Sequence, residues 1–228
     1  RPFKFRDATK KLRKQRLQRR WPNLDLPVEA YGGELPFEPV MVEHQLVDPT
    51  QRWSLLRRCN VDPTVHPVWR FKGGEQAALA RWQAFKEKGL NGYARRRNNA
   101  ADANGVSRMS AYIHYGMISP MKIAREAAEV GTKSAEKYLD ELLVFREHPW
   151  HHIYATPEPY GVHNLPEWAR LSWRSTADDP RTTRYTLRQL QRGEVHDPLW
   201  AACQRSLLRH GELHNNVRMT WGKALTLW

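Results

Sequence analysis

Residues 196–228 read HDPLWAACQRSLLRHGELHNNVRMTWGKALTLW, and this stretch decides how the rest of the chain is interpreted. Asp197 is a favoured N-cap residue, and Pro198 suits the first position of a helix. Gly211 fits just past the end of that helix. The stretch therefore predicts two helices that meet at Gly211, with the second one running to Trp228.

The expected second helix carries unusual side chains on one face. Spacings of four and three residues place five positions there: His214, Arg218, Trp221, Leu225 and Trp228. An adjacent face carries Asn215, Met219 and Gly222. A helix used only for packing would present aliphatic groups, whereas this one presents amide, guanidinium, thioether and indole groups. These two faces predict a ligand-binding site.

The chain contains ten tryptophans, and three of them fall in this C-terminal stretch. Trp221 and Trp228 are two helical turns apart, so their indoles are expected on one side of the helix, about 10 Å apart. Trp200 lies in the preceding helix. Core packing explains such a stripe, and indoles at that separation also permit electron transfer. The spacing leaves both interpretations open.

Helical patterns extend upstream, and no segment alternates with a period of two residues for long enough to form a strand. Residues 75–88 are amphipathic, with Ala78, Trp82 and Phe85 facing inward and Gly89 closing the helix. Ser107, Ser119 and Ser134 are positioned to start further helices, the last of them running to Trp150. Short helices are also expected over residues 166–173 and 186–192. We predict an all-α fold.

The N-terminal segment differs from the rest in charge. The chain carries +13 at pH 7, and residues 1–22 hold ten Lys and Arg against the single acid Asp7. Residues 7–21 predict a basic helix with Leu12 and Leu17 on its apolar side, which contacts nucleic-acid backbone or forms a solvated or interdomain face. Residues 22–67 are rich in proline and predict an irregular connector, with a helical turn near residues 53–58.

Residues 107–110 form a cluster of hydroxyl and guanidinium groups around an expected helix N-terminus. Ser107, Arg108 and Ser110 belong to it, with Tyr93 and the arginines at 95–97 slightly upstream. Free amides, the positive end of the helix dipole and nearby arginines are what a phosphate or pyrophosphate needs. The alternative is an ordinary capped helix that follows a solvated basic turn.

Glu141 lies on a helix that also carries several histidines. Its carboxylate is placed to hydrogen-bond a base edge or to transfer a proton, and the alternative is a simple ion pair with Arg146. His148 and His152 have the i,i+4 spacing of metal ligands, but Pro149 disturbs the helix and no third ligand is indicated. We expect no metal.

The two cysteines, Cys59 and Cys203, exclude a disulfide framework and a cysteine-held metal site, and they fit a reducing intracellular compartment. No apolar run reaches the length of a transmembrane helix, so no membrane association is expected. No signal peptide is visible.

Four segments, taken in order, resemble the flavin-binding helical domain of the DNA photolyase and cryptochrome family. They are GGEQAA from Gly73 with Tyr93 and the pair Arg97 and Asn98, SRMSAYIHYGMISP from Ser107, YLDELLVFRE from Tyr138, and DPLWAA from Asp197 continued by HNNVRM up to Met219. The sequence is most similar to class II cyclobutane-dimer photolyases. It departs from that class at Ala111, Phe145 and Asn215.

This resemblance implies roles for individual residues. It implies FAD as cofactor, held by Tyr93, Ser107, Arg108, Met109, Ser110 and Arg146. It implies a pyrimidine-dimer site formed by Glu141, Asn215 and Met219, with Glu141 hydrogen-bonding a base carbonyl, and DNA contacts from Arg97 and Arg218. Trp200, Trp221 and Trp228 correspond to the electron-transfer tryptophans.

The resemblance also implies a division of the chain. Residues 1–64 form a basic helix and interdomain connector, and residues 65–228 form a helical FAD-binding and catalytic domain. The family carries an N-terminal antenna domain and a C-terminal segment that completes the flavin cage, and this sequence contains neither. We expect a monomer that repairs cyclobutane pyrimidine dimers in DNA by light-driven electron transfer from FAD, a deoxyribodipyrimidine photo-lyase activity. The rival hypotheses are a cryptochrome-like flavin photoreceptor and a flavin-free nucleic-acid-binding remnant.

Overall fold

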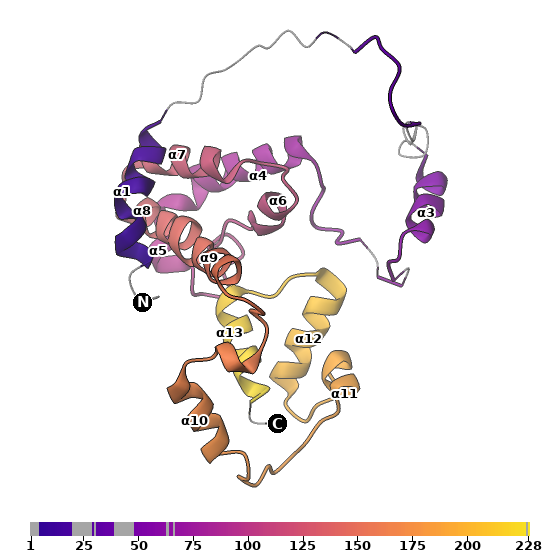
Figure 1. The fold of residues 1–228 in the computed structure, drawn as a ribbon, viewed down its shortest axis with the longest axis vertical. Helices are drawn as coiled ribbons and strands as arrows, with labels where there is room; N and C mark the ends of the chain where they lie inside the picture. The colour runs from indigo at the N-terminus through magenta and orange to yellow at the C-terminus, as the bar shows by residue number, and fades with distance from the viewer. Residues whose placement is uncertain are drawn as a thin grey trace. The chain divides into compact units, whose positions relative to one another are not determined.

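A computed structural model describes residues 5–19, 29, 31–38, 48–62, 64–65, 67–226 and 228. Every regular element in these residues is a helix, which confirms the all-α class. The chain divides into two units: Arg1–Arg20 with Arg70–Trp228, called here the helical unit, and Trp21–Trp69. Figure 1 shows the helices in chain order.

The core of the helical unit lies among α4 (Glu75–Lys88), α7 (Pro120–Val130) and α8 (Lys133–Asp140). Ala78, Trp82 and Phe85 are buried on α4, as the amphipathic pattern predicts. Trp82 stacks on Tyr138 of α8 with 5.8 Å between the ring centroids. Aromatic packing of this kind contributes beyond the area that it buries, so it fixes α4 against α8.

Helix α7 begins and ends where the sequence predicts. Ser119 caps it by accepting from the backbone N–H of Lys122, and Gly131 closes it in the left-handed region at φ 65°. Helix α8 begins one residue earlier than expected, because the hydroxyl of Thr132 accepts from the N–H of Ala135 and serves as the cap.

The helix expected to continue to Trp150 is interrupted. A π-helical turn, η3 (Glu141–Phe145), separates α8 from α9 (Glu147–Ala155). The N–H of Arg146 donates to the carbonyl of Glu141, five residues back, at 3.0 Å. Such turns insert an extra residue and recur at functional sites. Periodicity does not reveal this one because its residues are as apolar as an ordinary helical turn.

Three short elements connect α4 to α7: η2 (Leu90–Gly92), α5 (Tyr93–Arg96) and α6 (Ser110–His114). The expectation that Ser107 caps a helix is wrong. Helix α6 begins at Ser110, and its cap position is Met109, which provides no side-chain hydrogen bond. The hydroxyl of Ser107 instead accepts from the N–H of Met109 at 3.4 Å.

The basic helix is α1 (Phe5–Gln18), and it lies against α7 and η3 (Figure 1). Arg6 forms an ion pair with Asp140 at 2.7 Å, and Phe5 contacts the rings of His148 and His151. Leu17 packs on the core. The sequence predicts that this helix belongs with the connector. In the structure it packs on α7 and η3 and is part of the helical unit. The expected helix end at Trp21 lies outside the described residues.

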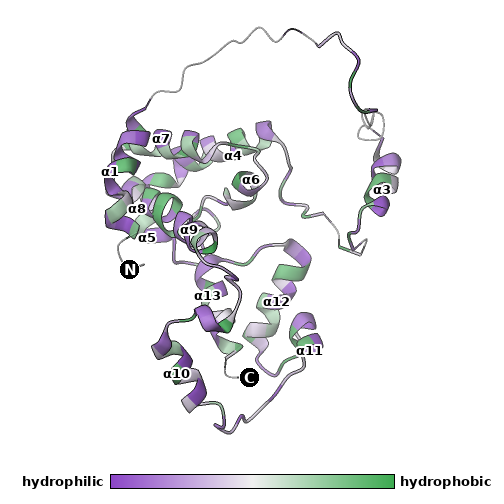
Figure 2. Ribbon diagram, in the orientation of Figure 1, coloured by the Kyte–Doolittle hydropathy of each residue, from purple (hydrophilic) through white to green (hydrophobic). Residues whose placement is uncertain are grey.

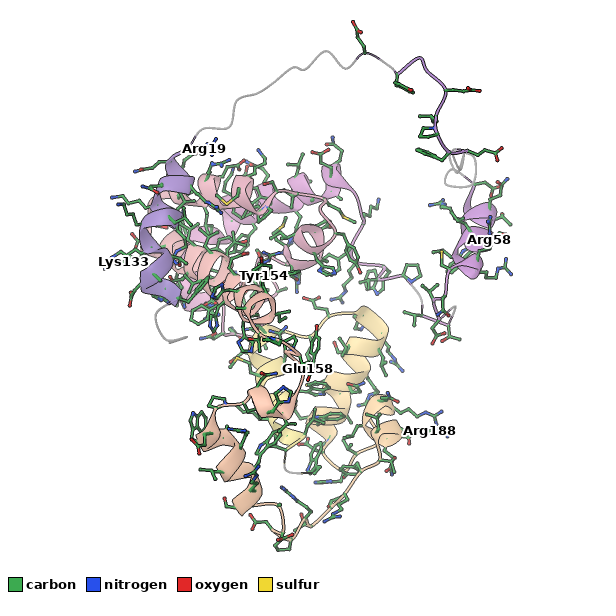
Figure 3. The ribbon with its side chains drawn as sticks, viewed as in Figure 1. Arg19, Arg58, Lys133, Tyr154, Glu158 and Arg188 are labelled. Carbon is green, nitrogen blue, oxygen red and sulfur yellow. The ribbon has the colours of Figure 1, made fainter. Side chains whose placement is uncertain are left out.

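From Tyr154, near the end of α9, the chain passes through Glu158 to η4 (Val162–Asn164) and α10 (Glu167–Ser175); both residues are labelled in Figure 3. It then forms α11 (Leu187–Arg192), where Thr186 and Gln189 form a capping box and Gly193 ends the helix at φ 72°. Both short helices occur close to their predicted ranges.

The C-terminal stretch forms α12 (Pro198–His210) and α13 (Asn215–Ala224). Asp197 caps α12 by accepting from the N–H groups of Leu199 and Trp200, and Gly211 ends it at φ 60°. Figure 2 shows hydrophobic and hydrophilic segments alternating along α12, as in an amphipathic helix. One expectation is wrong: α13 ends at Ala224, so Trp228 lies beyond the helix rather than on it.

In the second unit, α3 (Pro49–Arg58) occupies the place where a helical turn was expected. Asp48 caps it by accepting from the N–H of Thr50. Parts of the predicted connector at residues 22–67 lie outside the described residues. Across the helices that the structure describes, none combines the length and the apolar character that crossing a bilayer would require.

Candidate functional site

The three tryptophans of the C-terminal stretch are in contact, with Trp200 in the middle. Trp200 stacks on Trp221 with 5.1 Å between centroids and 10° between ring planes, and its ring meets that of Trp228 edge-on at 5.5 Å. Its indole N–H donates to the carbonyl of Trp221 at 3.0 Å. Trp221 and Trp228 do not share one helix as expected, because α13 ends at Ala224, and both indoles contact Trp200.

A small pocket of about 210 Å³ lies between α12 and α13 beside these indoles. Its lining includes Trp200, Cys203, Asn216 and Trp221. Pockets for whole organic ligands usually exceed about 300 Å³. This pocket alone is therefore too small to enclose a whole dinucleotide cofactor.

Asn215 and Met219 both lie near the start of α13. The side-chain carbonyl of Asn215 accepts from the guanidinium of Arg218 at 2.6 Å. Met219 is 54% exposed, four residues further along the same helix. His214 caps α13 by accepting at Nδ1 from the N–H of Asn216 at 3.2 Å. The cap orients the first turn, so an amide, a guanidinium and a thioether are presented together.

Glu141 is held by two cations. Its carboxylate lies 3.0 Å from Arg97 Nη2 and 2.7 Å from Lys137 Nζ. The ion pair with Arg146 that the sequence left open is not formed, because Arg146 pairs with the adjacent Glu147. The structure thus brings together Glu141 and Arg97, two residues predicted for different roles.

One hydrogen bond and one ion pair, both between residues far apart in the chain, connect the start of α13 with the rest of the site. The side-chain amide of Asn216 donates to the carbonyl of Asn98 at 3.2 Å, next to Arg97. Arg108 forms an ion pair with Glu212, just before α13. A path of direct contacts therefore runs from Glu141 through Arg97 and Asn98 to Asn216, the neighbour of Asn215. The sequence shows Asn98 only as part of a motif and gives no signal for Glu212, since each acts through a partner more than a hundred residues away.

Behind the 107–110 segment lies a buried aromatic group. The hydroxyl of Tyr138 donates to the hydroxyl of Ser107 at 3.3 Å, and its ring meets Tyr93 edge-on at 5.1 Å. Burial raises the pKa of both tyrosines, so both stay neutral hydrogen-bonding groups at physiological pH. Met109 is also buried, with 1% of its surface exposed. Tyr138, packed against Tyr93, therefore holds the Ser107 hydroxyl from the buried side of the segment.

Two arginines, Arg108 and Arg81, place positive charge at the 107–110 segment. Arg108 adopts φ 57°, a left-handed conformation uncommon for a residue with a side chain, and its guanidinium donates to the carbonyl of Ala103 at 2.7 Å. Arg81, which sequence reasoning missed, donates to the carbonyls of Ser107 and Val106 at 2.9 and 3.2 Å. Burial and the nearby charge of Arg108 lower the pKa of Arg81. No local pattern on α4 marks this contact.

The polar part of this segment fits a diphosphate group. Helix α6 begins without a side-chain cap, Ser110 is exposed at its first position, and Arg108 and Arg81 add positive charge nearby. Uncapped amides with adjacent guanidinium groups bind phosphate oxygens. Arg146 is placed differently: no hydrogen bond or ion pair joins it to residues 107–110 in the described part of the chain.

The histidines near α9 take part in packing. His148 and His151 contact Phe5 with 5.4 and 5.5 Å between ring centroids. In the ranges that the structure describes, no three His, Cys, Asp or Glu side chains come together as a metal site requires.

Curated proteins similar to the chain carry one common name. The chain is 35% identical to the deoxyribodipyrimidine photo-lyase of Methanothermobacter thermautotrophicus over 158 residues, which are 69% of this chain and 35% of that protein. It is 32% identical to the enzyme of that name from Oryza sativa subsp. japonica over 211 residues, and 34% identical to that from Arabidopsis thaliana over 217. These matches cover 88% and 91% of the chain and 42% of each relative.

No protein-family profile matches the chain. The chain spans 35% to 42% of the length of these three relatives. Their identity to it nevertheless extends over 69% to 91% of its own residues. On this similarity, the chain belongs to the photolyase family.

Proposed function

We propose that the protein repairs cyclobutane pyrimidine dimers in DNA with light and FAD, as the class II photolyases that its motifs resemble are expected to do. The observation that carries the proposal is the path of contacts from Glu141 through Arg97 and Asn98 to Asn216. Through these contacts, the carboxylate of Glu141 on η3 is connected to the first turn of α13, which carries Asn215. Two polar groups on different elements are what recognition of a base edge requires.

The chain supplies binding and orientation for this reaction. The resemblance implies that Glu141 bonds a base carbonyl, but a carboxylate paired with Arg97 and Lys137 only accepts hydrogen bonds. We therefore assign the ring N3–H of a pyrimidine as its partner instead. The amide of Asn215 both donates and accepts, and the exposed thioether of Met219 packs against the apolar part of the dimer. The chemistry that bound, reduced FAD would supply is light-driven donation and recovery of a single electron.

Four residues hold the cofactor's diphosphate in this proposal. Ser110 and the amides that begin α6 bind the phosphate oxygens, and Arg108 and Arg81 balance their charge. Ser107 positions the turn through its bond to Tyr138. Trp200, Trp221 and Trp228 carry electrons toward the cofactor, since their direct contacts support transfer.

The two arginines predicted to contact DNA act partly through their neighbours. Arg97 holds Glu141, and Arg218 holds Asn215. The exposed guanidinium of Arg218 has further donors for a phosphate, whereas Arg97 is mostly buried and acts mainly by holding Glu141. Loss of either side chain therefore releases a lesion-contacting group, and loss of Arg218 also weakens DNA binding.

The test uses the full-length protein. A visible absorption spectrum records bound flavin, and illumination with dimer-containing DNA is followed by loss of dimers. We expect both signals. Bound flavin without dimer loss would favour a cryptochrome-like photoreceptor, and absence of flavin would favour a nucleic-acid-binding remnant. For the relay, Trp221→Phe should slow flavin photoreduction, whereas Trp150→Phe, which changes an exposed tryptophan on α9, should not.

A further inference from the structure

One side chain connects the proposed diphosphate segment with the turn between α12 and α13, called here the hinge (Figure 1). Glu212 lies in the hinge, between Gly211, which ends α12, and His214, which caps α13. Its carboxylate forms an ion pair with Nε of Arg108. Its backbone carbonyl accepts from the hydroxyl of Ser206 on α12 at 3.2 Å. Both the side chain and the backbone of Glu212 are therefore held.

The guanidinium of Arg108 is fixed from two directions. Its Nε–H donates to Glu212, and Nη1 donates to the carbonyl of Ala103 at 2.7 Å. Only 23% of the Arg108 side chain and 26% of the Glu212 side chain are exposed, so salt screens this ion pair less than a pair on the surface. Among the described residues none bonds Nη2 of Arg108, whose N–H groups are donors for a phosphate oxygen. Arg108 can therefore hold Glu212 and a diphosphate together.

The backbone of Arg108 makes it a firm anchor. Its φ of 57° lies in the left-handed region, which a residue with a side chain adopts at a cost in free energy. Arg81 donates to the carbonyls of Ser107 and Val106, the two residues before Arg108, at 2.9 and 3.2 Å. Such a conformation persists only where the surrounding structure fixes it. A group bonded to Arg108 is therefore fixed with it.

The charge of Glu212 has different consequences for the two proposed sites. A carboxylate close to a diphosphate repels it, so Glu212 lowers the affinity for the cofactor. In the same place it offsets the repulsion between two guanidinium groups. Burial and the charge of Arg108 lower the pKa of Arg81, and the charge of Glu212 acts in the opposite direction. A carboxylate here is therefore explained by what it does for the arginines and for α13, and not by cofactor binding.

The hinge determines where α13 begins. His214 accepts at Nδ1 from the N–H of Asn216 at 3.2 Å, and its carbonyl accepts from the N–H of Arg218 at 2.8 Å. Asn215, the first residue of α13, lies only three residues after Glu212. Because so short a stretch of chain has little reach, the anchored Glu212 limits where the amide of Asn215 can lie.

We propose that Glu212 is a positioning residue, which anchors the hinge on Arg108 and so places Asn215 for the pyrimidine dimer while lowering cofactor affinity. The inference rests on the proposed function, because that function assigns the dimer to Asn215 and the diphosphate to Arg108. It predicts opposite effects at the two sites. Loss of the charge of Glu212 strengthens flavin binding and weakens the discrimination between damaged and undamaged DNA. A residue that only stabilised the fold would weaken both when replaced.

The experiment measures both kinds of binding in the full-length protein, in the dark. Glu212→Gln keeps the shape of the side chain and removes its charge. Flavin fluorescence follows release of the cofactor on dilution, and release should be slower than in wild type. At saturating flavin, the ratio of affinities for dimer-containing and undamaged duplex DNA should fall by about twofold to thirtyfold. In the matched control Glu194→Gln, where an exposed carboxylate pairs with Arg192 at 3.8 Å, neither quantity should change.

A double-mutant cycle tests the route through Arg108. Arg108→Gln removes the other half of the ion pair, so it should lower dimer discrimination as much as Glu212→Gln does, while speeding flavin release. The double variant should discriminate no worse than either single variant, because residues that act as one pair are not additive. Additive losses would overturn the inference. So would unchanged discrimination in Glu212→Gln, or weaker binding of both ligands by that variant.

A measurement without DNA separates this inference from the proposed function. Hydrogen–deuterium exchange of the peptide spanning residues 212–219 reports on the start of α13 in flavin-loaded protein. Exchange should be faster in Glu212→Gln than in wild type and Glu194→Gln, whether or not the protein splits dimers. Equal exchange would show that Glu212 does not anchor the hinge. A wild-type protein that shows this difference but does not recognise dimers would remove the proposed function and keep the anchor. Near-ultraviolet circular dichroism checks that each variant is folded.

Discussion

At the scale of single residues, Glu141 is the side chain on which the proposed lesion site depends. Its carboxylate lies within 3.0 Å of Arg97 Nη2 and 2.7 Å of Lys137 Nζ. Replacing Glu141 with Gln removes the charge that holds both cations and keeps the shape of the side chain. We expect light-driven dimer loss to slow by about tenfold to a hundredfold, measured as dimers split per absorbed photon.

A matched control lies on the same stretch of helix. Glu136 of α8 is exposed. It directly precedes Lys137 and lies five residues before Glu141. Glu136→Gln removes the same charge at a distance from the proposed site, so its repair rate should match wild type. Equal rates in both variants would remove Glu141 from the proposed site.

A second residue, Glu126, links stability to pH. Burial raises the pKa of Glu126, but hydrogen bonds from Lys122, Lys86 and Trp82 outweigh burial and bring it down to about 2. A carboxylate whose folded-state pKa is depressed stabilises the fold above its unfolded-state pKa, near 4.5. That stabilisation is lost as pH falls from about 4.5 to about 2, because the folded state then binds the proton at a cost.

Glu126→Gln tests this linkage. At pH 7 we expect the variant to be less stable by about 1 kcal/mol, the size of a good partly exposed ion pair. The difference should shrink as pH falls through the window from about 4.5 to about 2. Urea unfolding at several pH values measures it, with Glu129→Gln on the same helix as control. A difference that stays constant over this range would contradict the depressed pKa.

At the scale of elements, the hinge between α12 and α13 determines where Asn215 lies. Gly211 adopts φ 60°, a region that residues with a side chain adopt only at a cost. We expect Gly211→Ala to lower the free energy of unfolding by about 1–2 kcal/mol. Because the strain acts at the hinge, dimer repair should fall in addition.

Gly222 provides the opposite case within α13. A Cβ added there meets nothing within 4 Å, and alanine favours an interior helical position over glycine by about 0.5–1 kcal/mol. Gly222→Ala should therefore stabilise the protein by about that amount. Thermal unfolding of Gly211→Ala and Gly222→Ala measures both changes in stability. If the two midpoints shifted equally and in the same direction, the left-handed conformation of Gly211 would not matter.

At the scale of the whole molecule, the net charge of +13 predicts salt-dependent binding to DNA. Lys10, Lys11 and Lys14 lie on the exposed face of α1, while Phe5 and Leu17 face the helical unit. If these lysines meet phosphates, replacing all three with Gln should reduce the slope of log affinity against log salt by up to about three.

The measurement is a salt titration of affinity for undamaged duplex DNA. Dimer splitting within the bound complex should not change, since the three lysines lie on α1 and no proposed site residue does. An unchanged slope would assign the basic face of α1 to solvent or to another domain, the alternative that its sequence permits.

Helix boundaries were predicted well wherever a local chemical signal marks them. Asp197, Pro198 and Gly211 define α12, and Ser119 and Gly131 define α7, because each acts on neighbouring backbone groups only. Prediction failed where two signals competed or none existed. Ser107 has the chemistry of a cap but bonds Met109 and Tyr138 instead, and the extra residue in η3 leaves no mark in an apolar run.

The sequence by itself determined the all-α class, the caps that start α7 and α12 and the motifs that match the photolyases, because these depend on contacts within a few residues. Only the tertiary structure decided that Trp200 lies between Trp221 and Trp228 and that Arg97 holds Glu141. It also decided that the stretch from His196 to Trp228 is anchored on Arg108 through Glu212. These contacts join residues far apart in the chain, so they arise only when several helices pack at once.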